Sequence, residues 1–108
     1  DKVLREKFEV VKELLEYRKN AGETTAERGT ALLYNILQLL RESNEKINIA
    51  RYAYLLSKLK PTEGADSQYK SLYEKLASKM YGWAADKRDR DELLMAITIY
   101  LYMTRRRA

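Results

Sequence analysis

The chain has 108 residues, of which 45% are apolar, enough for one small domain with a single core. Neither cysteine nor histidine occurs, which excludes disulfides, thiolate zinc sites and the commonest general base. The net charge of +5 is uneven, because residues 1–45 carry −1 and residues 46–108 carry +6. This distribution is expected of a face that binds a polyanion, and a salt-bridged surface with a fortuitous imbalance explains it equally well.

Apolar residues recur every three or four positions along most of the chain, which predicts an all-α, compact bundle of about five helices. We expect a single helical domain over residues 1–108. The first helix is predicted to run from about residue 2 to 20, with Gly22 as its stop signal. Thr24 or Thr25 is expected to cap the second helix, whose broad apolar face predicts a central, well-buried element ending near Ser43.

The third helix is predicted from about residue 45 to 60, capped by Asn44 and followed by Pro61, which disfavours helical geometry at the residue before it. After a loop, the fourth helix is expected to begin near Ser67 and end at Gly82.

A charged run, Asp86–Glu92, follows the fourth helix and is interpreted as a solvated turn whose charges pair with one another. The last helix is then expected to carry Leu93, Leu94, Ile97 and Leu101 on its apolar face.

No arrangement of residues indicates catalysis. Serines and threonines occur without a plausible base, and no glycine-rich loop could cradle a phosphate. The carboxylates of Asp86, Asp89 and Asp91 would bind a divalent cation only weakly, through a flexible loop. We therefore predict a protein that is not an enzyme and that needs no metal or cofactor. No apolar run of 18 residues occurs, so we predict no membrane contact and a cytoplasmic location.

The third predicted helix carries the most suggestive pattern for binding. Arg51 and Lys58 are seven residues apart, so they share a helical face, and Tyr54 lies between them, one turn from each. Arginine binds phosphate through two parallel hydrogen bonds, lysine acts as a point charge, and tyrosine stacks on a base. The alternative is that Tyr52 and Tyr54 fill the core and that the cations are merely solvated.

Two other features leave the same choice open. The terminal Arg105–Arg107 could grip phosphate, but a helix C-terminus favours cations in any case, and we prefer that explanation. Nine tyrosines stand beside one phenylalanine and one tryptophan. Tyr100 and Tyr102 cannot share a helical face, so one of them is expected at the surface, where tyrosine is common in protein interfaces.

Three segments resemble the small subunit of type III-A (Csm) CRISPR effector complexes, over roughly residues 24–104. Thr24–Arg28 resembles the family's Thr/Ser-rich helix start followed by a basic residue. Ala53–Lys58 resembles its tyrosine, two residues, glycine, arginine element, with Ser57 in place of the glycine and Lys58 in place of the arginine. Leu93–Tyr102 resembles its closing helix.

The resemblance implies a small, non-catalytic ribonucleoprotein subunit of an antiviral defence complex. Such subunits stack in several copies along a filament, contact the other effector subunits, and bind guide RNA and target RNA through the backbone without reading sequence. Arg51 and Lys58 are the first candidates for these phosphate contacts, followed by Arg28 and Lys46, with Tyr54 beside them. Alternatives are the small subunit of a type III-B complex, another helical nucleic-acid-binding protein, or a scaffold that binds only proteins.

Overall fold

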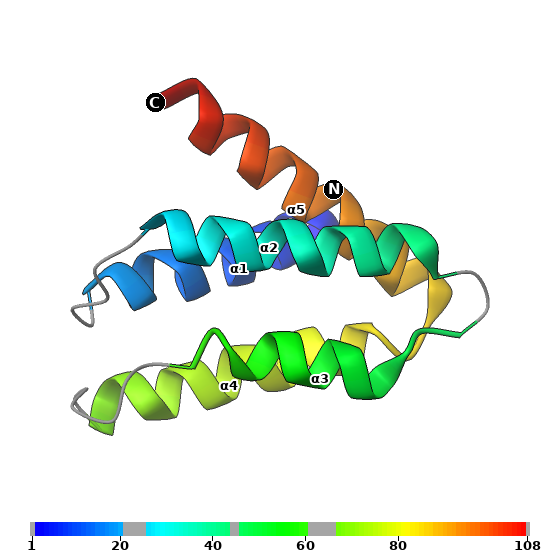
Figure 1. Ribbon diagram of the computed structural model, residues 1–108, viewed down its shortest axis with the longest axis horizontal. Helices are drawn as coiled ribbons and strands as arrows, with labels where there is room; N and C mark the ends of the chain where they lie inside the picture. Colours follow the sequence, from blue (N-terminus) through cyan, green and yellow to red (C-terminus); the bar gives the residue numbers. More distant parts are fainter. Residues whose placement is uncertain (1, 21–25, 44–45, 61–66, 108) are drawn as a thin grey trace.

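The computed structural model describes residues 2–20, 26–43, 46–60 and 67–107, and all its regular elements are helices (Figure 1). The predicted all-α bundle of five helices is confirmed. The predicted stop at Gly22 and the caps Thr24, Thr25 and Asn44 lie outside the described residues. The helices are α1 (Lys2–Asn20), α2 (Ala26–Glu42), α3 (Ile49–Ser57), α4 (Ser67–Trp83) and α5 (Lys87–Arg107).

The helices form two pairs joined by a fifth (Figure 1). α1 and α2 lie side by side, α3 and α4 form the second pair, and α5 packs against α1, α2 and α4. The C-terminal half of α5 extends beyond the α1–α2 pair. None of the helices in the described part of the chain combines the length and the apolar character that a bilayer-spanning segment requires.

Every helix contributes to one core because each has apolar residues at helical spacing. In α3 and the turn after it, the buried positions are 52, 55, 56 and 59, a stripe that turns residues 51, 54 and 58 outward. α2 is less buried than its broad apolar face predicted, since Leu32, Leu37 and Leu39 are only half-buried. The core residues of the other helices include Val11, Leu14, Leu33, Ile36, Leu76, Met80, Leu93 and Ile97.

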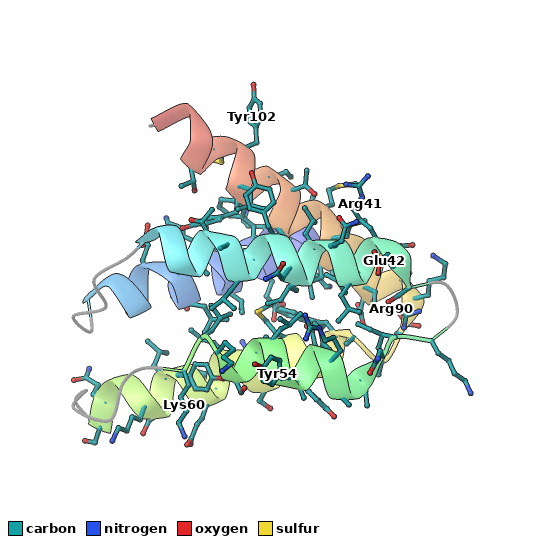
Figure 2. The ribbon with its side chains drawn as sticks, in the orientation of Figure 1. Arg41, Glu42, Tyr54, Lys60, Arg90 and Tyr102 are labelled. Atoms are coloured by element: carbon teal, nitrogen blue, oxygen red, sulfur yellow. The ribbon has the colours of Figure 1, made fainter. Side chains whose placement is uncertain are left out.

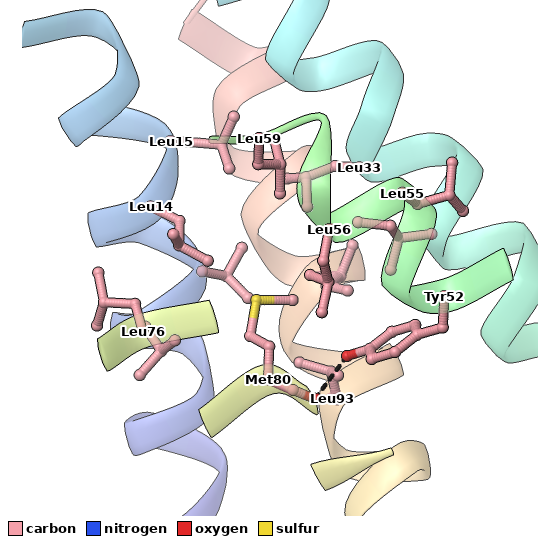
Figure 3. Close-up of a cluster of buried hydrophobic side chains, with 14 of the residues drawn as sticks. Leu14, Leu15, Leu33, Tyr52, Leu55, Leu56, Leu59, Leu76, Met80 and Leu93 are labelled. Carbon is pink, nitrogen blue, oxygen red and sulfur yellow. Dashed lines mark hydrogen bonds between the residues drawn. The ribbon is translucent and has the colours of Figure 1, made fainter. Parts of the chain in front are cut away.

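Two buried tyrosines tie α3 to α4 by capping each other's helix. The Tyr52 hydroxyl donates to the Met80 carbonyl at 2.6 Å, in the last turn of α4 (Figure 3). The Tyr73 hydroxyl donates to the Leu56 carbonyl at 2.7 Å, in the last turn of α3. Carbonyls in the last turn of a helix lack the partner that a longer helix would supply. Each tyrosine therefore satisfies a terminal carbonyl of the other helix and fixes how α3 sits on α4.

The third helix is shorter than predicted. It begins at Ile49 because the Asn48 side chain accepts a hydrogen bond from the Arg51 backbone N–H at 3.1 Å, which makes Asn48 the N-cap. Regular helix ends at Ser57, and the chain continues in a turn through Lys60. The predicted range of 45–60 was therefore too long at both ends.

The charged run after α4 was predicted to be a turn. In the structure it forms the start of α5. The Asp86 carboxylate accepts from the Asp89 backbone N–H at 3.2 Å and so caps the helix at its first turn. Arg90 is buried, and its guanidinium donates to the Ala84 carbonyl at 2.9 Å. The Lys87–Asp91 pair, at 3.2 Å on the exposed face, matches the predicted solvated pairing.

Lys7 of α1 is a buried cation that holds α1 to the start of α5. Its side chain is 1% exposed, and its ammonium lies 3.3 Å from Asp89 and 3.4 Å from Glu92. The same ammonium lies 4.9 Å from the centre of the Trp83 ring, which adds a cation–π contact. The carboxylates of the charged run thus compensate a buried charge 85 residues away in sequence.

Candidate nucleic-acid interface

The outward face of α3 brings together the three residues that the sequence pattern singled out. Arg51, Tyr54 and Lys58 are all exposed, and the Tyr54 side chain is 51% exposed. Figure 2 shows the place of Tyr54 on α3. The Arg51 guanidinium carbon lies 5.7 Å from the centre of the Tyr54 ring, and the Lys58 ammonium lies 4.9 Å from it. The interpretation that Tyr54 fills the core is therefore wrong, whereas Tyr52 does occupy the core.

Tyr54 positions the two cations without neutralising them. A cation over an exposed aromatic ring is stabilised by about 0.5–1 kcal/mol, enough to favour one arrangement of a long side chain. A cation–π contact engages the charge of the group and not its N–H hydrogens, so such a contact is compatible with donation to an anion. Because both groups lie within 5.7 Å of the centre of one ring, Arg51 and Lys58 present two positive groups close together on one face.

The segment around this face contains no acidic residue. Residues 46–60 include Lys46, Arg51, Lys58 and Lys60 and neither aspartate nor glutamate. All four cations are exposed. A group of exposed cations of this kind attracts polyanions over a range set by the Debye length, about 8 Å at physiological ionic strength. We call residues 46–60 the basic segment.

The opposite side of α3 fixes this face in place. Tyr52 is fully buried, and its burial raises the pKa of its hydroxyl well above the ordinary value, so the group stays a neutral hydrogen-bond donor. Burial, with a smaller contribution from the negative charge of Glu74, likewise raises the pKa of Tyr73. Because both hydroxyls stay protonated, the contacts that hold α3 to α4 persist at neutral pH.

Two further predicted residues lie apart from the Arg51–Tyr54–Lys58 face. Lys46 is exposed just before α3, within the basic segment. Arg28 lies in the first turn of α2, on another helix, and the placement of its side chain falls outside what the structure describes. The sequence interpretation missed Lys60, which lies just past the end of α3 (Figure 2). The absence of acidic residues from the basic segment was the signal that could have revealed it.

Clustered carboxylates do not form a metal site in the part of the chain that the structure describes, where no group of three or more could hold an ion. Asp86 and Asp89 instead serve the start of α5, as a helix cap and as a partner of Lys7. The four exposed cations of the basic segment suit binding of anions.

The chain belongs to the family described as the second helical domain of the Cmr2 subunit of the CRISPR RNA silencing complex, whose profile matches residues 6–106.

Individual relatives are proteins named CRISPR system single-strand-specific deoxyribonuclease Cas10/Csm1, of subtype III-A. The chain is 31% identical to the one from Mycobacterium tuberculosis over 74% of its length, 33% identical to the one from Enterococcus italicus over 90%, and 37% identical to the one from Streptococcus thermophilus over 74%. It spans only about a tenth of these relatives, between 9% and 11% of their length. No solved structure gives a significant match.

These comparisons confirm the resemblance to a helical type III CRISPR protein. The prediction that the chain is not an enzyme is wrong, because each of these relatives is named as a deoxyribonuclease. The error has a simple origin. The absence of a catalytic pattern concerned 108 residues, whereas the relatives that bear the enzyme's name are about eight times longer.

Proposed function

We propose that this chain acts as a nucleic-acid-binding helical domain of a type III-A CRISPR effector, gripping the phosphate backbone through the basic segment. The observation that carries the proposal is Tyr54, exposed between Arg51 and Lys58 in a segment, residues 46–60, that contains no acidic residue. Phosphate contacts fix position and affinity but carry no sequence information. Binding through this face is therefore expected to be indifferent to base sequence.

The strands to be bound follow from the proposed setting. In a type III-A complex, guide RNA and target RNA are the expected polyanions, and single-stranded DNA joins them because the relatives are named for acting on it. Each phosphate that binds to Arg51 or Lys58 releases condensed counterions, so affinity should fall steeply with salt. Lys46 and Lys60 would extend the contact along the strand.

Other effector subunits are the expected protein partners, including copies of this fold stacked along a filament. One surface suits such contacts. Met95, Ile99, Tyr102 and Met103 are exposed on α5 at spacings that place them on one face of the helix, and Tyr102 points away from the bundle (Figure 2). Exposed methionine and tyrosine are enriched in protein interfaces. This face is also the observation that favours the second candidate function, a scaffold that binds only proteins.

The test is the affinity of the chain for a 5′-fluorescein-labelled RNA of mixed sequence, measured by anisotropy from 20 to 300 mM salt. Exchanging both cations, Arg51→Glu with Lys58→Glu, should weaken binding for every sequence. It should also reduce the dependence of log affinity on log salt by roughly one unit for each lost phosphate contact.

The matched control is Lys75→Glu with Arg88→Glu, which changes the net charge equally at exposed positions of α4 and α5. If the two double variants weaken binding to the same extent, the affinity reflects net charge and the basic segment is not the site. If the unaltered chain elutes separately from RNA in size exclusion at physiological salt, the protein-only scaffold is the better function.

A further inference from the structure

We propose that the face formed by Arg51, Tyr54 and Lys58 takes single-stranded nucleic acid, holding one unstacked base against the Tyr54 ring. This inference rests on the proposed function and narrows it, since the phosphate contacts alone would serve a duplex equally well. The side chains around Tyr54 carry the argument.

The two flanks of Tyr54 are different. Residues advance by about 100° around a helix, which places Arg51 and Lys58 on one flank of position 54 and Ala50 and Ser57 on the other. The cations contact the ring at 5.7 and 4.9 Å. A helical side chain leans toward the preceding turn, so the ring lies near positions 50 and 51. On the second flank the nearest neighbour along the helix is the methyl group of Ala50.

Ser57 keeps this second flank low. Its hydroxyl donates to the Tyr54 carbonyl at 2.6 Å, so the side chain folds back onto the helix instead of reaching outward. Both Ala50 and Ser57 are exposed. Tyr54 is thus a raised aromatic ring with cations along one flank and two short side chains along the other. A flat base fits against the short side while the cations hold the adjoining phosphates.

A duplex cannot use this ring. Its bases are stacked inside, and in RNA the major groove is too deep and narrow for side chains to read. Unpaired bases, by contrast, are free to stack on aromatic side chains, and each stacked base contributes to affinity whatever its identity. A duplex would therefore contact only the cations of the basic segment, whereas a single strand would contact the cations and Tyr54 together. The exposed Tyr54 ring therefore makes the site prefer a single strand to a duplex.

Charge complementarity selects the occupant. With four exposed cations and no carboxylate, the basic segment fits a chain of regularly spaced negative charges. The aromatic ring among them fits a polyanion that also carries flat bases. RNA and DNA both combine a negatively charged backbone with flat bases, so both should bind as single strands. The one that binds more tightly is the expected natural ligand.

The experiment compares a 15-nucleotide single strand with a 15-base-pair duplex of RNA, each at low salt, and repeats the single strand with DNA. We expect Tyr54→Ala to weaken single-strand binding about 5- to 150-fold, the range for loss of one stacked base, and duplex binding by a smaller factor, because a duplex loses only the ordering of the two cations. Ala50→Leu fills the low flank without changing charge and should act in the same direction. Tyr34→Ala, at an exposed tyrosine of α2, is the matched control and should change neither affinity.

A strand carrying one 2-aminopurine reports stacking directly. Its fluorescence should change when it binds the unaltered chain and the Tyr34→Ala variant, and should not change with Tyr54→Ala. Equal loss of single-strand and duplex affinity in Tyr54→Ala would overturn the inference, because Tyr54 would then only position the cations; the proposed function would stand. Displacement of the strand by polyglutamate at equal charge would also overturn it. If Arg51→Glu with Lys58→Glu leaves all affinities unchanged, the proposed function itself fails.

Discussion

Removing the Tyr52 hydroxyl should destabilise the bundle more than removing any exposed tyrosine hydroxyl. Tyr52→Phe keeps the ring and its packing, so no cavity forms, and it deletes only the hydrogen bond to the Met80 carbonyl. In a longer helix the N–H of Ala84 would bond to that carbonyl. Here it donates to the Tyr81 carbonyl at 3.2 Å, so the tyrosine hydroxyl supplies the partner that Met80 lacks.

The expected loss follows from burial and from what remains after the change. A buried polar group left without a partner costs about 1–3 kcal/mol. Tyr52 is fully buried, so Tyr52→Phe should reduce the free energy of unfolding by about 2 kcal/mol. Tyr73→Phe should cost less, about 1 kcal/mol, because the Leu56 carbonyl keeps a second hydrogen bond from the Leu59 N–H at 3.0 Å.

Urea denaturation followed by far-ultraviolet circular dichroism measures these losses. The controls are Tyr81→Phe and Tyr102→Phe, which remove hydroxyls from side chains that are 46% and 61% exposed and should stay within about 0.5 kcal/mol of the unaltered chain. A Tyr52→Phe variant as stable as these controls would show that the Met80 carbonyl finds another partner. The reciprocal capping of α3 and α4 would then contribute nothing to stability.

Three further outcomes are expected. Lys7→Met should lower the free energy of unfolding, followed by thermal melting, by about 1–3 kcal/mol, because Asp89 and Glu92 lose the cation that they pair with. The loss is no larger because both carboxylates are partly exposed to water. An unchanged melting temperature would contradict the pairing. Burial raises the pKa of Tyr52, so stability should be constant below its ordinary pKa of 10.0 and fall above it, by up to about 1.4 kcal/mol per pH unit. Urea titrations from pH 9 to 11.5 should show a shallower fall in Tyr52→Phe. Asn48→Ala should lower the free energy of unfolding by about 1 kcal/mol, because the helix loses its N-cap. A variant as stable as the unaltered chain would indicate that α3 begins before Asn48.

The sequence was sufficient for the helices and insufficient for their ends. Helical spacing of apolar residues identifies a buried stripe wherever it occurs, so all five helices were predictable. The cap of α3 was not, because Asn44 and Asn48 are equally good capping residues four positions apart. Only the hydrogen bond between Asn48 and the Arg51 N–H distinguishes them.

The charged run at the start of α5 shows a different limit. Read locally, alternating acids and bases pair with one another and stay in water. In the fold, Asp89 and Glu92 face a lysine from the first helix, and Arg90 turns inward to the Ala84 carbonyl. A buried cation is tolerated only when partners surround it, and no local pattern reveals a partner 85 residues away.

For the candidate site, sequence correctly grouped Arg51, Tyr54 and Lys58, since i, i+3 and i+7 share a face in any helix. It left open whether Tyr52 or Tyr54 filled the core. Which tyrosine is buried depends on α4, because a buried tyrosine hydroxyl needs a hydrogen-bond acceptor. The Met80 carbonyl of α4 is such an acceptor, and it bonds to the hydroxyl of Tyr52.

The same arrangement bears on binding. α3 is held by a hydrogen-bonded tyrosine at each end, and its exposed tyrosine in turn restrains two cations. A surface that is already ordered loses less conformational entropy when it meets a ligand, so more of each phosphate contact appears as affinity. Tyr52→Phe leaves every exposed residue of the basic segment unchanged while loosening the helix that carries them. The RNA affinity of Tyr52→Phe reports how much the ordering of α3 contributes to binding, whereas the RNA affinity of the Arg51 and Lys58 variants reports how much the phosphate contacts contribute. Comparing the two therefore separates these contributions.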